Sequence, residues 1–290
     1  MDKWQNGLLT VGRFVLAAVL CVALVAALLC FALQTACERG VYIAAAETDA
    51  VVSALHTEVL EQLESECLFY DLPYDTMKTA LPLDTVKTVV TERASAVHTA
   101  LATGASLPSV TLSAAPFKTA IDSFFDTLPM EERPLDTDAS QTIATELSES
   151  LSRVLSMGIG DKVLKTAHPL FARAHRLADM RVWLLLGVFM LAAVGMIPVK
   201  TTFRRRAYST VGALFLGSAI TAVPTWLFAS LDFPAKLAIG DSALRDFVRT
   251  VLYTVIDRMT VIVTIAFIVS AVLLTASVVW LVKDKKQKTA

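Results

Sequence analysis

The stretch FVLAAVLCVALVAALLCFALQTAC, residues Phe14–Cys37, has 24 residues and contains no Asp, Glu, Lys, Arg or His. Three later stretches share this property and have 18, 25 and 24 residues: Val182–Val199, Ala207–Leu231 and Met259–Val282. About 20 apolar residues are needed to cross the hydrocarbon core of a bilayer as a helix. Because a backbone in lipid must satisfy its own hydrogen bonds, the sequence predicts four transmembrane helices.

The composition agrees with a membrane protein. Of the 290 residues, 55% are hydrophobic and 18% are charged, and the mean hydropathy is +0.59. A soluble chain of ordinary composition carries about 25% charged residues. The lower fraction of charged residues is explained by the four apolar stretches, which contain none.

The distribution of charge predicts the orientation. The segments before span 1, between spans 2 and 3, and after span 4 carry a combined charge of +8, whereas residues 38–181 carry −9. Basic residues accumulate on the cytoplasmic side of membrane proteins. We therefore expect a multi-pass protein of the cell membrane with both termini in the cytoplasm and residues 38–181 outside.

The predicted fold class is an all-α membrane protein with four transmembrane helices and an extracytoplasmic helical domain inserted between helices 1 and 2. The predicted order is a cytoplasmic N-terminus (1–13), span 1 (14–37), the helical domain (38–181), span 2 (182–199), a cytoplasmic loop (200–208), span 3 (209–231), an extracytoplasmic amphipathic helix (232–258), span 4 (259–282) and a cytoplasmic tail (283–290).

Span 1 also has an alternative interpretation as a cleavable signal sequence. Lys3 and Arg13 flank the apolar run, and Leu33–Cys37 is similar to a lipoprotein cleavage box. However, the run is longer than the 7–15 apolar residues typical of a signal sequence, and Gln34 stands where the box needs an aliphatic residue. We therefore expect span 1 to be retained.

Helical periodicity organises the polar domain. The stripe Val52, Leu55, Val59, Leu63 and Cys67 predicts a helix that ends before Pro73. This helix is expected to continue from span 1, with Gly40 as a possible kink or break. A tandem repeat follows, in which 72–80 and 81–89 match at six of nine positions. It predicts two helix starts capped by Asp75 and Asp84, and the second helix should run to Gly104.

The rest of the domain contains further predicted helices and one extended run. Residues 106–115 form a loop whose Val, Thr and Leu residues favour an extended chain, and 129–138 is an acidic connection. Close small residues, such as Ala213 and Gly217, predict tight packing between spans. Helices are predicted from Phe117, from Ser140, from Asp161 into span 2, and from an Asp241 cap into span 4.

Motifs of known chemistry are missing from the sequence, which contains no His-Glu-x-x-His, Cys-x-x-Cys, Gly-x-Ser-x-Gly or Walker-type phosphate loop. His168, His175 and Asp179 have helical spacing that suits a metal, but three candidate ligands near a membrane are more typical of solvated side chains. The acidic residues of the 129–138 connection lack an ordered ligand loop. We expect no enzyme activity, no metal and no cofactor.

Arg204, Arg205 and Arg206 form the one dense basic cluster. The simplest interpretation is a determinant of topology next to anionic lipid headgroups. The alternative is a contact for a cytoplasmic protein partner. Three residues at a membrane face do not suggest nucleic-acid binding.

Several features resemble those of uncharacterised four-span bacterial membrane proteins with a helical extracellular domain between spans 1 and 2. The resembling features are the helix that ends at Tyr70–Pro73, the helix from Asp84, and the long helices that lead into spans 2 and 4. The topology also looks like that of FtsX-type and MacB-type subunits, which signal across the membrane through an outer domain. The loop at 200–208 is shorter than the coupling helix of those subunits.

Two main functional hypotheses follow. The first is a non-enzymatic membrane protein whose outer domain binds an unknown protein partner or senses the state of the envelope. The second is a permease-like or mechanotransmitting subunit of an ABC-type transporter complex, as the resemblance to FtsX-type subunits implies. A membrane-bound hydrolase is a further alternative. The oligomeric state and the identity of the partner do not follow from the sequence.

Overall fold

The computed structural model describes residues 2–131, 138–197 and 203–289, and in these ranges every regular element is a helix. The helices are α1 (Asp2–Ala36), α2 (Arg39–Ala46), α3 (Asp49–Phe69), α4 (Tyr74–Thr79), α5 (Leu83–Thr103), α6 (Ala115–Thr127), α7 (Ala139–Leu155), α8 (Asp161–Asp179), α9 (Arg181–Met196), α10 (Phe203–Ser230), the 3₁₀ helix η1 (Phe233–Lys236) and α11 (Ser242–Thr289). The predicted all-helical class is confirmed.

Four helical stretches are long and apolar enough to cross a membrane, as predicted. They are Val11–Ala36, Asp161–Met196, Arg205–Ser230 and Ser242–Lys283. The second combines α8 and α9, which adjoin at Met180. Each of the four contains an apolar window long enough for the bilayer core.

The chain divides into two compact units. Unit 1 comprises Met1–Cys37, Arg173–Lys236 and Leu252–Ala290, and unit 2 comprises Glu38–Ala172 and Leu237–Val251. Each unit therefore gathers segments that lie far apart in the sequence.

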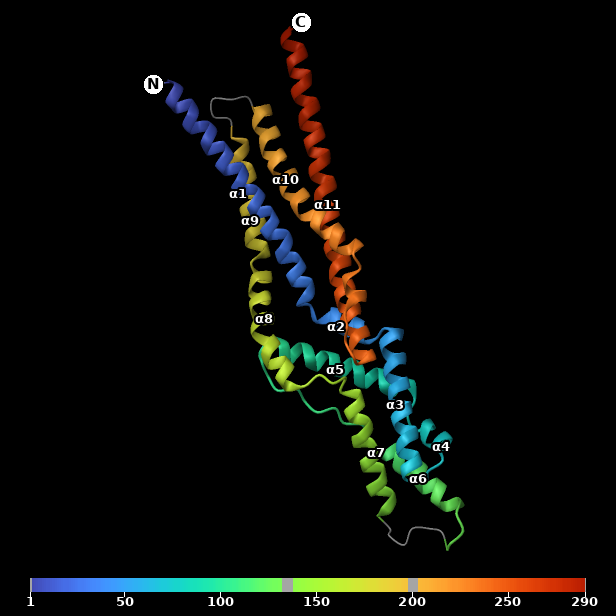
Figure 1. The fold of residues 1–290 in the computed structure, drawn as a ribbon. Coiled ribbons are helices and arrows are strands. Elements are labelled where there is room, and N and C mark those ends of the chain that lie inside the picture. Colours follow the sequence, from blue (N-terminus) through green and yellow to red (C-terminus); the bar gives the residue numbers. More distant parts are fainter. Residues whose placement is uncertain (1, 132–137, 198–202, 290) are drawn as a thin grey trace. The chain divides into compact units, whose positions relative to one another are not determined.

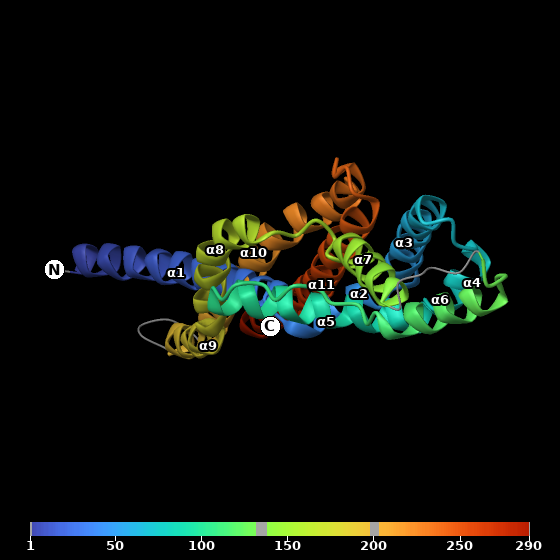
Figure 2. The same ribbon diagram turned by 90° about the horizontal axis from the view of Figure 1, so that it is seen from below.

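In unit 1, α1, α9 and α10 run side by side (Figures 1 and 2). Leu20, Val188 and Ala213 form the small apolar cluster at their centre. At Gly217 of α10, an added Cβ would lie 3.1 Å from the main-chain oxygen of Cys21. The predicted close packing of Ala213 and Gly217 is confirmed, because only small residues let two helix backbones approach this closely.

Helix α11 contacts α10 through polar and aromatic side chains. The hydroxyls of Ser218 and Ser270 are hydrogen-bonded at 2.7 Å, and Trp226 Nε1 donates to Thr264 Oγ1 at 3.0 Å. The ring of Phe267 packs against that of Trp226, with centroids 5.4 Å apart. Hydrogen bonds between helices strengthen packing where the surroundings supply no water.

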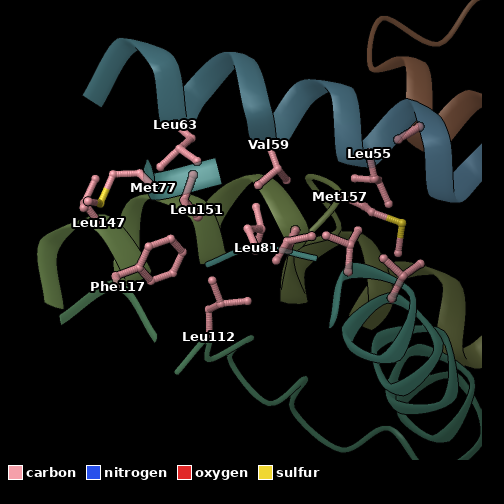
Figure 3. Packing of buried hydrophobic residues seen from close by; sticks show 14 of the residues in the cluster. Leu55, Val59, Leu63, Met77, Leu81, Leu112, Phe117, Leu147, Leu151 and Met157 are labelled. Carbon is pink, nitrogen blue, oxygen red and sulfur yellow. The ribbon is translucent and has the colours of Figure 1, made fainter. Parts of the chain in front are cut away.

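Unit 2 has the larger apolar core. Figure 3 shows Leu55, Val59 and Leu63 pointing from α3 into a cluster to which α7 contributes Leu151 and the turn after α7 contributes Met157. The predicted stripe on α3 is thus buried. The other clustered residues that the figure labels are Met77, Leu81, Leu112, Phe117 and Leu147.

The tandem repeat forms α4 and the start of α5, as predicted, but its caps differ from the prediction. Pro73 and Pro82 occupy the N-cap positions. Asp75 and Asp84 each lie two residues after the cap, in the first turn of the helix. There each carboxylate faces the positive end of the helix dipole instead of capping an amide. The end of α5 is as predicted, because Gly104 is its C-cap with a φ of 74°.

The expected continuous helix from span 1 to about residue 69 is wrong, and the first break, at Glu38, lies close to the possible kink at Gly40. The chain breaks after α1 and again after α2, where Glu38 and Thr48 have extended backbone with ψ of 122° and 140°. Thr48 Oγ1 donates to the carbonyl of Ala45 at 2.8 Å, which shows how a threonine near a helix end favours a local turn. The segment therefore consists of three helices.

The start of α11 belongs to unit 2 and is capped as predicted. Asp241 Oδ1 accepts a hydrogen bond from the amide of Leu244 at 2.8 Å, and the Ser242 hydroxyl donates to a carboxylate oxygen of Glu58. Phe247 is buried in the core of the unit together with Ala243. The amphipathic segment that precedes span 4 is thus part of the larger core.

Candidate functional site

Unit 2 contains a groove of about 710 Å³. One wall is formed by residues 107–112, called the extended segment below, which lie in the thin ribbon that joins α5 to α6 in Figure 1. The other wall is α7. The lining residues are Arg93, 107–112, Thr145, Ser148, Glu149, Ser152, Arg153, Ser156 and 159–161. The groove therefore has a wall of main chain facing a wall of hydroxyl groups.

The hydroxyl wall follows from helical spacing. Ser148, Ser152 and Ser156 are four residues apart, so they lie on one face of α7 and its C-cap. Ser152 is 8% exposed. Its hydroxyl accepts a hydrogen bond from the amide of Leu112 at 2.9 Å and donates to the carbonyl of Ser148 at 2.5 Å. Ser152 thereby fixes one end of the extended segment to α7.

Arg93 of α5 fixes the other end of the groove. Its side chain is 7% exposed, and its two terminal nitrogens donate to main-chain carbonyls of Pro108, at 2.6 Å, and Ile159, at 3.0 Å. Asp161 accepts a hydrogen bond from the amide of Leu107 at 2.9 Å. Arg93 and Asp161 thus join α5, the extended segment and the turn before α8.

The charge of Arg93 persists in this setting. Burial lowers the pKa of the guanidinium, and the negative charge of Asp161 opposes that shift. An arginine remains protonated in proteins because its reference pKa lies above 12. A buried cation that donates to two carbonyls is therefore a fixed structural link.

The residues predicted as a basic cluster lie at a different place, in unit 1. Arg205 and Arg206 are in the first turns of α10 and line a cavity together with Arg13 of α1. Arg204 is in the same helix, but its side chain lies outside the described residues, as do residues 198–202. The sequence did not show that Arg13 joins these arginines.

The histidines that were considered as metal ligands are engaged separately. His168 Nδ1 lies 2.8 Å from the carbonyl oxygen of Leu101, and His175 Nδ1 lies 3.3 Å from Asp179 Oδ2. In the described part of the chain, no three His, Cys, Asp or Glu side chains lie close enough to share a metal ion. Most of the acidic 129–138 connection lies outside the described residues.

Arg93 was missed by the sequence reasoning, although a signal was present. It follows Val90 by three residues and precedes Val97 by four, so it lies on the stripe of buried positions of α5. A charged residue on an apolar stripe must find partners when the helix packs. The polar groove beside α5 is where those partners lie.

No protein-family model, curated protein or solved structure matches this chain. The resemblances to four-span bacterial proteins and to FtsX-type and MacB-type subunits therefore stay predictions.

Proposed function

We propose that this chain is a non-enzymatic integral membrane protein whose unit 2 binds an extended segment of a partner protein along residues 109–112. The observation that carries the proposal is the groove, in which an extended stretch of main chain lies open beside a row of hydroxyls. An exposed extended segment can pair with a second strand through main-chain hydrogen bonds, and its side chains then add specificity.

The hydrogen bonds of the extended segment favour this mode of binding. The amides of Leu107 and Leu112 and the carbonyl of Pro108 are bonded to unit 2 itself. Between them, no hydrogen bond within the described part of the chain involves the main chain of Ser109, Val110 or Thr111. Both ends of the segment are therefore held while its middle keeps main-chain groups for a partner.

The groove favours a polar, extended ligand over an apolar helix. Its walls carry hydroxyls and both signs of charge, with Glu149 and Arg153 on α7, beside small apolar patches such as Val110. An amphipathic helix needs a broad apolar groove, whereas a strand offers alternating donors and acceptors every few ångströms. We therefore propose an extended polypeptide with small or polar side chains as the ligand.

The proposal places unit 2 outside the cytoplasm and both termini inside it. The support is the charge of the connecting segments, +8 for the three predicted cytoplasmic segments against −9 for residues 38–181. A partner in the envelope or on another cell surface would then reach the groove without crossing the membrane.

Cysteine labelling tests this orientation. Met130 is 87% exposed, Lys283 is also exposed, and the four native cysteines are buried free thiols. We expect Met130→Cys to react with a membrane-impermeant maleimide in intact cells, and Lys283→Cys to react only after permeabilisation. Labelling of Lys283→Cys, but not of Met130→Cys, in intact cells would reverse the proposed topology.

Site-specific photocrosslinking tests the groove. A photoreactive residue at Thr111 of the full chain in native membranes should give a discrete adduct, and the same residue at exposed Thr57 of α3 should not. Val110→Pro should abolish the adduct because proline lacks the amide donor. Val110→Ala loses the same side-chain packing but keeps the amide, so its adduct should persist.

The outcomes of the crosslinking experiment separate the hypotheses. An adduct that survives Val110→Pro in a folded protein would overturn pairing along the main chain. Equal adducts at Thr57 and Thr111 would also overturn it. Co-purification of an ATPase that is lost on substitution of Arg205 and Arg206 would instead favour the transporter-subunit hypothesis.

A further inference from the structure

A cavity of about 150 Å³ in unit 1 lies among α1, α9 and α10. Arg13, Arg205 and Arg206 line it together with Ser209 and Thr210. The remaining lining residues are apolar or small: Leu16, Ala17, Leu20, Leu191 and Gly195. The cavity thus combines a cationic, hydroxyl-bearing part with an aliphatic part.

Helical spacing explains how these residues meet. Leu16, Ala17 and Leu20 follow Arg13 by three, four and seven residues, so they continue its face of α1. On α10, Ser209 follows Arg205 by four residues and Thr210 follows Arg206 by four. On both helices the arginines therefore precede the other lining residues along one face.

Gly195 of α9 lets α9 and α10 approach each other beside the cavity. An added Cβ at this position would lie 2.7 Å from Thr210 Oγ1, too close for a real contact. Thr210 is 5% exposed. The absence of a side chain at Gly195 thus leaves room for the Thr210 side chain at the cavity wall.

The charge of the cavity selects an anion. Three guanidinium groups line it, and none of the described residues that line it is acidic. Guanidinium groups form paired hydrogen bonds with phosphate oxygens, and serine and threonine hydroxyls can donate further ones. A phosphate group matches both the charge and the donors of this set.

The aliphatic wall distinguishes a lipid from a free ion. Leu16 and Leu191 would give inorganic phosphate nothing to bind, but they offer an acyl chain an apolar surface. We propose that this cavity binds an anionic phospholipid, with its phosphate at Arg13, Arg205 and Arg206 and a chain along the leucines. The inference rests on the proposed membrane insertion and is independent of the groove in unit 2.

Lipid retention by the full-length protein tests the proposal. Protein purified in a mild detergent would be titrated with phosphatidylglycerol or phosphatidylcholine and analysed by native mass spectrometry. We expect the wild type to retain phosphatidylglycerol at least about tenfold more tightly, because each arginine near a headgroup contributes a severalfold gain in affinity. Arg13→Gln and Arg206→Gln should each lower that affinity about fivefold.

Matched variants separate this site from general attraction between charges. Lys283→Gln removes the same charge from α11, outside the cavity, and should change the affinity less than twofold. Arg13→Lys keeps the charge and should retain part of the binding. Thr210→Val replaces a hydroxyl by a methyl group and leaves the charge unchanged. Its affinity for phosphatidylglycerol should be lower than that of the wild type, which tests the cavity even if Arg13→Gln does not fold.

Three results would overturn the proposal. Equal retention of the two lipids would exclude recognition of the anionic headgroup. Equal effects of Arg13→Gln and Lys283→Gln would exclude this cavity. Displacement of phosphatidylglycerol by millimolar inorganic phosphate would assign the site to the free ion. Each of these results could occur while the maleimide labelling still supported membrane insertion. Failure of the lipid site can therefore be distinguished from failure of the proposed membrane insertion.

Discussion

Replacing Arg93 by methionine should lower the free energy of unfolding by about 2–4 kcal/mol, because hydrogen bonds from a charged donor each contribute roughly 1.5–3 kcal/mol. Methionine keeps most of the side-chain length but leaves the carbonyls of Pro108 and Ile159 without their donor. The change can be measured by denaturant titration of the full chain in detergent. Hydrogen exchange should accelerate most at the bonded amides of Leu107 and Leu112 and in the turn 157–159.

Arg153 provides the control for this substitution. It lines the same groove but its side chain is exposed, so Arg153→Met should change the stability by no more than about 0.5 kcal/mol. If the two methionine variants were equally stable, Arg93 would not be the link between α5 and the extended segment. A loss of crosslinking at Thr111 in Arg93→Met would connect this link to the proposed partner site.

Gly217→Leu should destabilise the packing of α1 on α10 by roughly 3 kcal/mol, at the upper end of the usual cost of overpacking. The atoms nearest to a new Cβ include the main-chain oxygen of Cys21 at 3.1 Å and its Cα at 3.4 Å. Main-chain atoms cannot rotate away as a flexible side chain can, so the two helices must separate. Thermal unfolding in detergent should show a lower midpoint.

The same helix contains a matched glycine. An added Cβ at Gly212 meets no atom within 4 Å, so Gly212→Leu should leave the midpoint unchanged or raise it slightly, because leucine favours a helix more than glycine does. Equal midpoints for Gly212→Leu and Gly217→Leu would show that the contact between α1 and α10 is not as close as described.

The ends of a helix were predictable wherever a residue next to the end favours a break or a cap. Pro73, Gly104 and the Asp241 cap each act through their own backbone or side chain, and the helices end or begin beside them. Gly40 made a kink near the first break possible, but the break at Thr48 was not predicted, because threonine does not forbid a helix. The extended geometry of Glu38 and Thr48 depends on how α2 and α3 pack in three dimensions.

The candidate site was less predictable than the fold. Residues 106–115 could be read as an extended loop, but the sequence does not show that they lie against the serines of α7, since that contact joins positions about 40 residues apart. The arginine cavity has the same origin, because Arg13 and Arg206 meet only when α1 packs on α10. The periodicity of the sequence predicts which side chains share one face of a helix, but not which helices pack against that face.

The two side-chain hydrogen bonds between α10 and α11 limit how these helices can move relative to each other. The Ser218–Ser270 bond and the Trp226–Thr264 bond fix the axial register of the two helices at two levels. Sliding by one helical turn, about 5.4 Å, would break both bonds. If these helices cross a membrane as proposed, we expect them to adapt to a thicker or thinner bilayer by tilting together.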